Sequence, residues 1–364
     1  MIGRSLAVLA TALAFSASAA AQAASYDGTY FVHGFNDGYY RFDMTVPALR
    51  ARGLDLKAVR APSLSSTQPV AIQADELRSY QNGYLWFSDS TILVGHSMGG
   101  LTSRAAYLAN PANIVGIVTV ATPHQGSPIA VGGQRFTRHM GLVVARTVRA
   151  IVGFATYLPF SGPTVRHILS DHGTISDLVV AEINTRNAAS SPGAADLRPA
   201  SATIQSLSAA RADGVLPRAN VVGEIPYRHA VWYVLASAQR NEGLASGYIR
   251  TRTTVKSFAK TCKHVAYATI ILWAQGRECA KLDRAISQID NEYLGAVNGR
   301  APSGRPLIGA NDGLVPQSHS IYPSAASLQP RIAVGANHNN ITYVLPGIVA
   351  LDAALMSVGV KRSP

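Results

Sequence analysis

A serine between two glycines has the spacing of a nucleophile held at a sharp turn. Residues 95–99 read Gly-His-Ser-Met-Gly, directly after the apolar residues 91–94 and before a helical pattern. Glycines two positions before and after Ser97 remove the Cβ atoms that would block a tight strand-to-helix turn. The chain has 31 glycines, so the five-residue pattern alone could be an ordinary turn. The flanking strand and helix patterns favour a nucleophile, and the N-terminus of the helix favours developing negative charge.

A serine hydroxyl is a poor nucleophile near neutral pH and needs a base oriented by a carboxylate. In proteins with a serine at such a turn, the chain order is serine, then acid, then histidine. Of the ten histidines, His319 and His338 follow the candidate acid Asp312. His338 lies between a strand-like segment and the last helical segment, so we predict that it is the base. His319 follows Asp312 too closely for a separate strand end, so we predict a structural role.

Four carboxylates are candidates for the acid. Asp312 lies in an Asn-Asp-Gly turn and has the expected place in the chain order. Asp213 lies in a near copy of that turn but precedes the expected strand 220–224, so it ranks second. Asp283 and Asp290 belong to a charged helical stretch and are expected at the surface.

The loop after the first apolar strand has the residues of an oxyanion hole. It reads His33-Gly34-Phe35, and the glycine allows the main chain to approach a reacting carbonyl. We predict that the backbone N–H groups of Phe35 and Met98 stabilise the oxyanion, each by roughly 3 kcal/mol. His33 is expected to hold the loop by hydrogen bonds without transferring a proton.

These residues need a parallel sheet to bring them together. Short apolar segments alternate with helical patterns, which is typical of βαβ units and of a mostly parallel sheet with helices on both faces. The fold class is therefore α/β. We expect strands at residues 29–32, 54–59, 91–94, 114–120, 220–224 and 331–334, and helices at 42–52, 70–80, 98–108 and 341–356.

Two irregular segments interrupt this alternation. Residues 127–215 and 227–308 have no clear strand, and we interpret them as insertions that form a mainly helical cap. The apolar stretch 140–158 contains Arg146 and Arg149, which would be costly within a lipid bilayer. A cap helix is therefore preferred to a membrane span, and whether its apolar face packs on the sheet or opens towards lipid stays open.

The N-terminus predicts export. Residues 1–23 have one early arginine, a short apolar run and a final Ala-Gln-Ala, the pattern of a signal peptide cleaved after Ala23. An N-terminal membrane anchor is the alternative, but the run is short. The mature chain 24–364 is expected to be one domain that is secreted to the periplasm or the medium.

Two cysteines, Cys262 and Cys279, lie close together in the second insertion. In an exported protein they are expected to form a disulfide, which in a loop of this length is worth about 3 kcal/mol. Two free thiols are the alternative. The spacing typical of zinc sites is missing, and no metal is predicted.

The composition limits the partners. The formal net charge is +12 and 48% of the residues are hydrophobic. This charge favours peripheral contact with anionic surfaces. Arginines are scattered, without basic runs that include aromatic residues, so nucleic-acid binding is not expected. The oligomeric state is left open.

The motifs together resemble the bacterial secreted true lipases, in the triacylglycerol lipase and esterase group of the α/β-hydrolase superfamily. The resemblance covers the sheet but neither insertion, and it implies an α/β-hydrolase fold with Ser97, Asp312 and His338 as the triad. It also implies that His124 is structural. The family's calcium site has an aspartate where this chain has Asn340, so the resemblance does not extend to Ca²⁺. The matching segments are residues 32–35, 95–100, 121–127, 311–316 and 337–340.

The predicted reaction is acyl transfer from an ester to water through an acyl-enzyme, without a cofactor. The apolar insertions favour hydrophobic acyl groups, so a lipase or carboxylesterase acting on a hydrophobic ester or at a lipid or polymer surface is the first interpretation. A secreted aliphatic polyester depolymerase is the second, since the same triad serves both. An acyltransferase and a non-catalytic envelope-binding protein are the alternatives from other classes.

Overall fold

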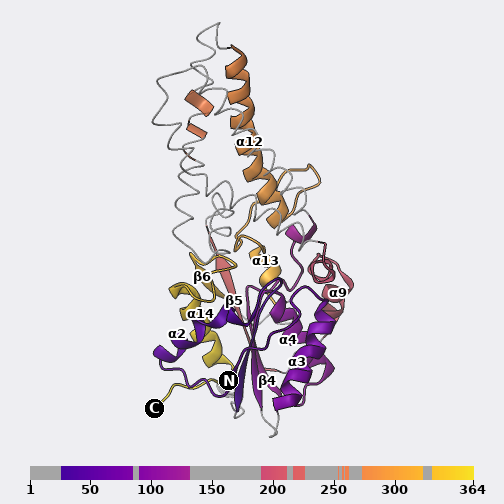
Figure 1. Ribbon diagram of the computed structural model, residues 1–364, viewed down its shortest axis with the longest axis vertical. Coiled ribbons are helices and arrows are strands. Elements are labelled where there is room, and N and C mark those ends of the chain that lie inside the picture. The colour runs from indigo at the N-terminus through magenta and orange to yellow at the C-terminus, as the bar shows by residue number, and fades with distance from the viewer. Residues whose placement is uncertain are drawn as a thin grey trace, which may run out of the picture.

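The computed structural model describes residues 26–84, 90–131, 190–210, 216–225, 273–322 and 330–364, together with residues 253, 256, 257 and 259–261 (Figure 1). The expected signal peptide and the apolar stretch 140–158 lie outside these ranges. So do large parts of both expected insertions, and the domain boundaries stay a prediction.

The core of the protein is a parallel sheet. Its strand order in the described part is β2-β1-β3-β4-β5-β6, and all five neighbouring pairs run parallel. Every residue of β1 and β3 is buried, as expected for a sheet covered on both faces. The strands are β1 (Gly28–Val32), β2 (Val59–Arg60), β3 (Thr91–His96), β4 (Ile114–Val120), β5 (Arg218–Glu224) and β6 (Arg331–Val334).

Helices cover both faces of this sheet. Ile92 and Val94 pack in one buried cluster with residues of α2 and α14, and Leu93 packs in another with residues of α3 and α4. The expected α/β class and helical coverage are confirmed. The helices are η1 (Tyr39–Phe42), α2 (Thr45–Ala51), α3 (Val70–Tyr84), α4 (Met98–Ala109), α8 (Pro192–Asp196), α9 (Ala202–Ala209), α12 (Trp273–Asn298), α13 (Gln317–Ser320) and α14 (Leu345–Ser357).

Three expected elements differ from the structure. The strand predicted at 54–59 is reduced to Val59–Arg60, because Leu54 forms an antiparallel bridge with Arg362 near the C-terminus instead of joining the sheet. The helix predicted at 42–52 is divided into η1 and α2, and the last helix begins at Leu345 rather than at residue 341. Both α2 and α14 have a proline in their first turn, the helical position where a proline is tolerated.

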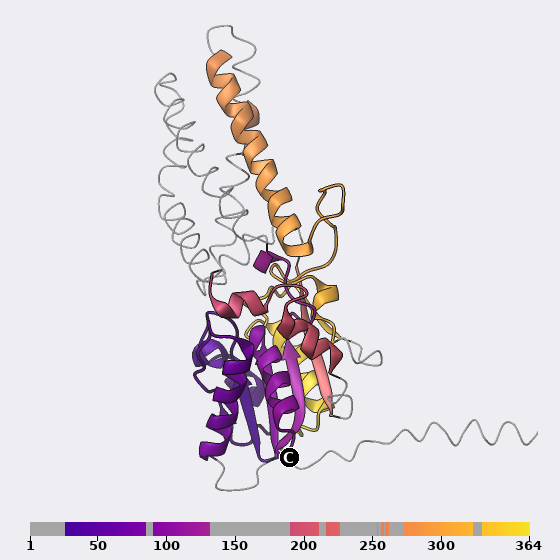
Figure 2. The same cartoon turned by 90° about the vertical axis from the view of Figure 1, so that its right-hand side faces the viewer.

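Part of the first expected insertion packs tightly on the sheet domain. In α9, Ile204 and Leu207 join Met98 and Leu101 in one buried apolar cluster, so this segment supports the helix behind Ser97. Part of the second expected insertion extends away from the sheet instead. It forms α12, a 26-residue helix that projects from the sheet domain (Figures 1 and 2). No described helix combines the length and the apolar character that crossing a membrane would require.

Cys279 is buried on α12. No cysteine is free in the part of the chain that the structure describes. Cys262 lies outside that part, so the disulfide between the two stays a prediction.

Candidate active site

Ser97 lies at a strained turn between β3 and α4. Its backbone has φ 55° and ψ −126°, a combination that a residue with a side chain rarely adopts. A Cβ on Gly95 would lie 2.4 Å from the carbonyl oxygen of Gly99, and a Cβ on Gly99 would lie 2.3 Å from that of Val32. Both glycines are therefore required by close backbone packing, as the sequence predicts.

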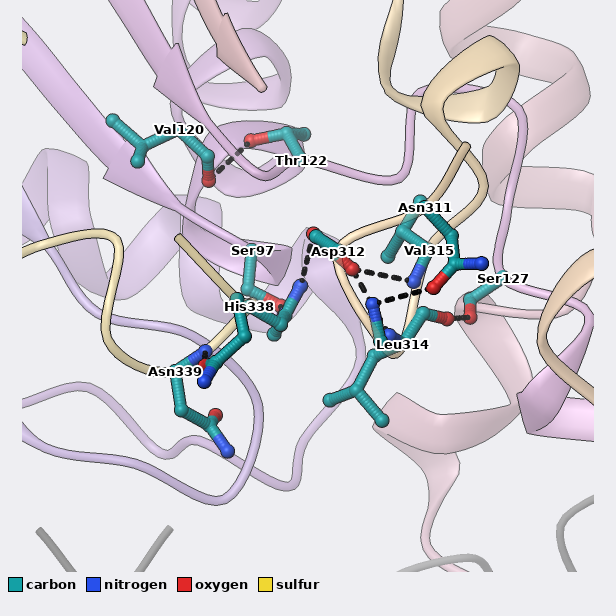
Figure 3. A network of polar contacts seen from close by, with 12 residues as sticks. Ser97, Val120, Thr122, Ser127, Asn311, Asp312, Leu314, Val315, His338 and Asn339 are labelled. Carbon is teal, nitrogen blue, oxygen red and sulfur yellow. Dashed lines mark hydrogen bonds and ion pairs between the residues drawn. The ribbon is translucent and has the colours of Figure 1, made fainter. Parts of the chain in front are cut away.

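The structure brings the three predicted side chains into one hydrogen-bonded chain (Figure 3). The Nε2 atom of His338 lies 2.8 Å from the Oγ of Ser97, and its Nδ1 lies 2.8 Å from the Oδ2 of Asp312. The side chains of His338 and Asp312 are 6% and 0% exposed, so little water competes for these bonds. With Nδ1–H donating to the carboxylate, Nε2 is left as the acceptor for the serine proton.

Backbone N–H groups hold the carboxylate of Asp312. Its Oδ1 accepts hydrogen bonds from the N–H groups of Leu314 and Val315, at 2.9 and 2.8 Å. The turn is closed by Asn311, whose Oδ1 accepts from Gly313 N–H at 2.9 Å (Figure 3). These contacts stabilise the ionised carboxylate and leave its other oxygen for His338.

Two residues that the sequence analysis did not single out support this turn. Tyr293 on α12 donates its hydroxyl hydrogen bond to the carbonyl oxygen of Gly313. Burial, with a smaller contribution from the charge of Asp312, raises the pKa of Tyr293 well above its ordinary value, so the hydroxyl keeps its proton. A Cβ on Gly223 of β5 would lie 2.9 Å from the Cβ of Asp312, so only a glycine lets the acid approach that strand.

The loop of His338 is held by asparagines. Asn337 Oδ1 accepts from the N–H groups of Asn339 and Asn340, and Asn340 Oδ1 accepts from the N–H of Asn337 at 2.7 Å. The oxygen of Asn340 thus helps to hold the loop of the base. Within the described ranges, no group of three or more His, Cys, Asp or Glu side chains could hold a metal ion.

The expected oxyanion loop lies directly against the nucleophile. A Cβ on Gly34 would lie 2.7 Å from the Cβ of Ser97, so a glycine is needed for the main chain to come this close to the nucleophile. Met98 is the first residue of α4, and its N–H therefore has no partner within the helix. Asn36 follows with φ 50°, which turns the loop away after Phe35.

A hydrogen bond from Arg41 links this region to the loop of the base. Arg41 on η1 pairs with Asp37 and donates from Nη1 to the carbonyl oxygen of Asn339 at 2.8 Å. No local sequence pattern predicts this contact, because Arg41 and Asn339 are 298 residues apart in the chain.

Three other histidines have structural contacts. His33 is buried and its Nε2 accepts from the N–H of Leu64 at 2.9 Å, while its Nδ1 lies 3.1 Å from the oxygen of Gly34, as expected for a residue that holds the loop. His319 Nδ1 lies 2.8 Å from the oxygen of Gly126. His124 is buried, with its Nε2 3.1 Å from the Oγ1 of Thr119. None of these three rings contacts the triad.

The structure describes two of the three other candidate acids. Asp213 lies outside the described residues. Asp283 and Asp290 belong to α12, as the predicted helical stretch requires.

We expect the buried histidines to make the folded protein acid-sensitive. Burial, reinforced by neighbouring arginines, lowers the pKa of His96 and His124 well below the ordinary value. In the unfolded chain the pKa of each of these histidines returns to about 6.5. Below that pH the unfolded chain therefore binds more protons than the folded protein does. The free energy of unfolding should therefore be largest above pH 7 and fall by up to about 3 kcal/mol per pH unit below 6.5 from these two groups.

Urea denaturation between pH 5 and pH 8 measures this dependence. His124→Gln removes one of the two groups, and its stability should fall about half as steeply as the pH is lowered. A free energy of unfolding that does not change between pH 5 and pH 7 would contradict the expectation.

The chain resembles known proteins over part of its length. Residues 77–184 match a family described as PGAP1-like alpha/beta domain. The matched segment includes Ser97, and it lies within a molecule whose parallel sheet presents that residue at the end of β3. By its fold the protein belongs to the α/β class, with a parallel sheet covered by helices. No curated protein matches the chain.

Several solved structures are similar to this protein. The mature lipase BlEst2 of Bacillus licheniformis is 14% identical with a TM-score of 0.46, and the match covers 93% of this chain and 94% of that one. A pyrethroid hydrolase from Sphingobium faniae is 20% identical with a TM-score of 0.24, over 29% of this chain and 45% of that one. An extracellular α/β-hydrolase from a Paenibacillus species is 22% identical with a TM-score of 0.24, over 29% and 46%. The chain thus spans less than half of the pyrethroid hydrolase.

Proposed function

We propose that the protein is a secreted serine hydrolase that cleaves carboxylic esters of hydrophobic acyl groups through an acyl-enzyme. One observation carries the proposal: the hydrogen-bonded chain from the Oγ of Ser97 through the imidazole of His338 to the carboxylate of Asp312. A serine on a strained turn, a base within 2.8 Å and a buried acid are the parts that nucleophilic acyl transfer needs.

The reaction follows from these positions. Ser97 Oγ attacks the ester carbonyl while His338 Nε2 takes its proton, and the carbonyl oxygen becomes an oxyanion facing the N–H groups of Phe35 and Met98. Collapse of this intermediate breaks the ester bond, and His338 returns the proton to the leaving alcohol. Water then attacks the acyl-enzyme with His338 again as the base, releasing the acid and restoring the serine.

Exposed apolar side chains beside the site favour a hydrophobic substrate. Tyr39 and Tyr40 follow the oxyanion loop directly and are 56% and 43% exposed. Met44, directly before α2, and Leu345, the first residue of α14, are 62% and 69% exposed. Such side chains suit an apolar ester or its aggregated surface better than a small polar ester. The resemblance to the true lipases points the same way.

A substrate panel tests the proposal. The purified protein is given soluble short-chain esters, emulsified long-chain triglyceride and an aliphatic polyester film, and released acid is titrated. We expect hydrolysis of esters with hydrophobic acyl groups, with Ser97→Ala as the blank. Preference for film over triglyceride would favour a depolymerase. If the reaction in excess alcohol gives mostly the transesterified product, the protein is better described as an acyltransferase. Folded protein that cleaves no ester would contradict the proposal.

A further inference from the structure

His96, the residue before the nucleophile, contacts the loop of the base. It ends β3 and is 2% exposed. Its Nε2 lies 2.7 Å from the backbone carbonyl oxygen of His338, and the two imidazole rings have centroids 5.2 Å apart. Neither the nucleophile nor the acid takes part in this contact.

The chemistry of this contact determines the state of the His96 ring. A carbonyl oxygen only accepts, so Nε2 must carry the proton and donate. Burial, reinforced by the positive charge of Arg41, lowers the pKa of His96 well below its ordinary value, so the ring is neutral and Nδ1 has no proton. Among the described residues Nδ1 has no hydrogen-bond partner, and a Cβ on Gly34 would lie only 3.3 Å from it. Among the described residues, the ring of His96 is therefore hydrogen-bonded through Nε2 to the carbonyl oxygen of His338.

With this bond, both backbone polar groups of His338 are hydrogen-bonded. The N–H of His338 donates to the carbonyl oxygen of Asp312 at 2.7 Å, and its carbonyl accepts from His96 at 2.7 Å. The two polar groups of one residue are thus held by the acid turn and by the nucleophile turn. Because His96 is bonded to Ser97 in the chain, any shift of the base loop away from the nucleophile must break this hydrogen bond.

We propose that His96 is a positioning residue that keeps the imidazole of His338 within proton-transfer distance of Ser97. This inference rests on the proposed function. His96 touches no reacting atom and transfers no proton, and it acts on the reaction only through the main chain of the base. A misplacement of about 1 Å in a catalytic group costs about 100-fold in rate, which sets the size of the effect.

Three variants separate positioning from stability. His96→Gln keeps an amide N–H donor at a similar reach, His96→Asn keeps polarity but is too short, and His96→Leu has no donor. We expect kcat per active site to fall about 10- to 100-fold in the Asn and Leu variants, with KM within about twofold of the wild type. The Gln variant should stay within about fivefold of the wild type.

Active sites are counted with a fluorophosphonate, and its rate of reaction with Ser97 should fall by the same factor as kcat. His319→Leu is the matched control, since this ring also contacts a backbone carbonyl, 2.8 Å away at Gly126, but away from the base loop. It should keep the wild-type kcat per site. If His96→Leu does not fold, the comparison of Asn with Gln decides.

Equal loss in the Gln and Asn variants, or wild-type kcat per site in Asn or Leu, would overturn the positioning role. Failure of the proposed function looks different, because the wild type would then be inactive or Ser97→Ala would stay active. An active wild type that loses activity in Ser97→Ala but is unchanged in His96→Asn leaves the hydrolase function standing and removes only this inference.

Discussion

Replacing Ser97 with alanine should lower kcat/KM for p-nitrophenyl esters by at least about 10⁴-fold, because a reaction through an acyl-enzyme has no other atom to attack the ester. The backbone strain at residue 97 is present with either side chain, and the serine hydroxyl is hydrogen-bonded to the ring of His338. We therefore expect the free energy of unfolding to change by no more than about 1 kcal/mol. Ester hydrolysis and urea denaturation measure the two effects.

Ser103→Ala is the matched control for this variant. Ser103 lies on α4, is buried, and donates to the carbonyl oxygen of Gly99 at 2.7 Å. Its loss should cost some stability and leave kcat near the wild-type value, and a fluorophosphonate should still label the Ser103 variant but not the Ser97 variant. Most of the activity persisting without the hydroxyl of Ser97 would remove the proposed mechanism.

Asp312→Asn should lower kcat by about 10⁴-fold while the protein stays folded. The N–H groups of Leu314 and Val315 point at one side-chain oxygen of residue 312, so the amide oxygen of an asparagine must face them. Its NH₂ group then faces Nδ1 of His338 and donates to it. The imidazole must then carry its proton on Nε2, the atom that has to accept the proton of Ser97. His338 keeps its position but has the wrong tautomer, so it can no longer act as the base.

The near copy of this turn supplies a matched control. Asp213→Asn makes the same substitution in the Asp-Gly sequence that ranked second as the acid, and it should leave kcat near the wild-type value. Steady-state rates on one soluble ester compare the two variants. If the Asp213 variant loses activity and the Asp312 variant keeps it, the acid has been assigned to the wrong carboxylate.

The success of sequence analysis depended on how local each feature is. The turn at Ser97 was predicted because its requirements, glycines at fixed spacing between an apolar strand and a helix, all lie within a few residues. The strand predicted at 54–59 is shorter, Val59–Arg60, and Leu54 instead pairs with Arg362 at the far end of the chain, a contact that no local pattern reveals. Domain boundaries and the role of the insertions stay predictions.

The amino-acid sequence by itself determined the alternation of strands and helices, the nucleophile turn and the candidate acid and base, since backbone sterics and apolar periodicity act over short distances. Only the tertiary structure decided that Asp312, rather than another carboxylate, is hydrogen-bonded to His338. It also decided that His96 is hydrogen-bonded to the backbone of His338, 242 residues further along the chain. Parallel strands place their carboxyl ends at one edge of the sheet, but which side chains touch there depends on the packing of loops from both ends of the chain.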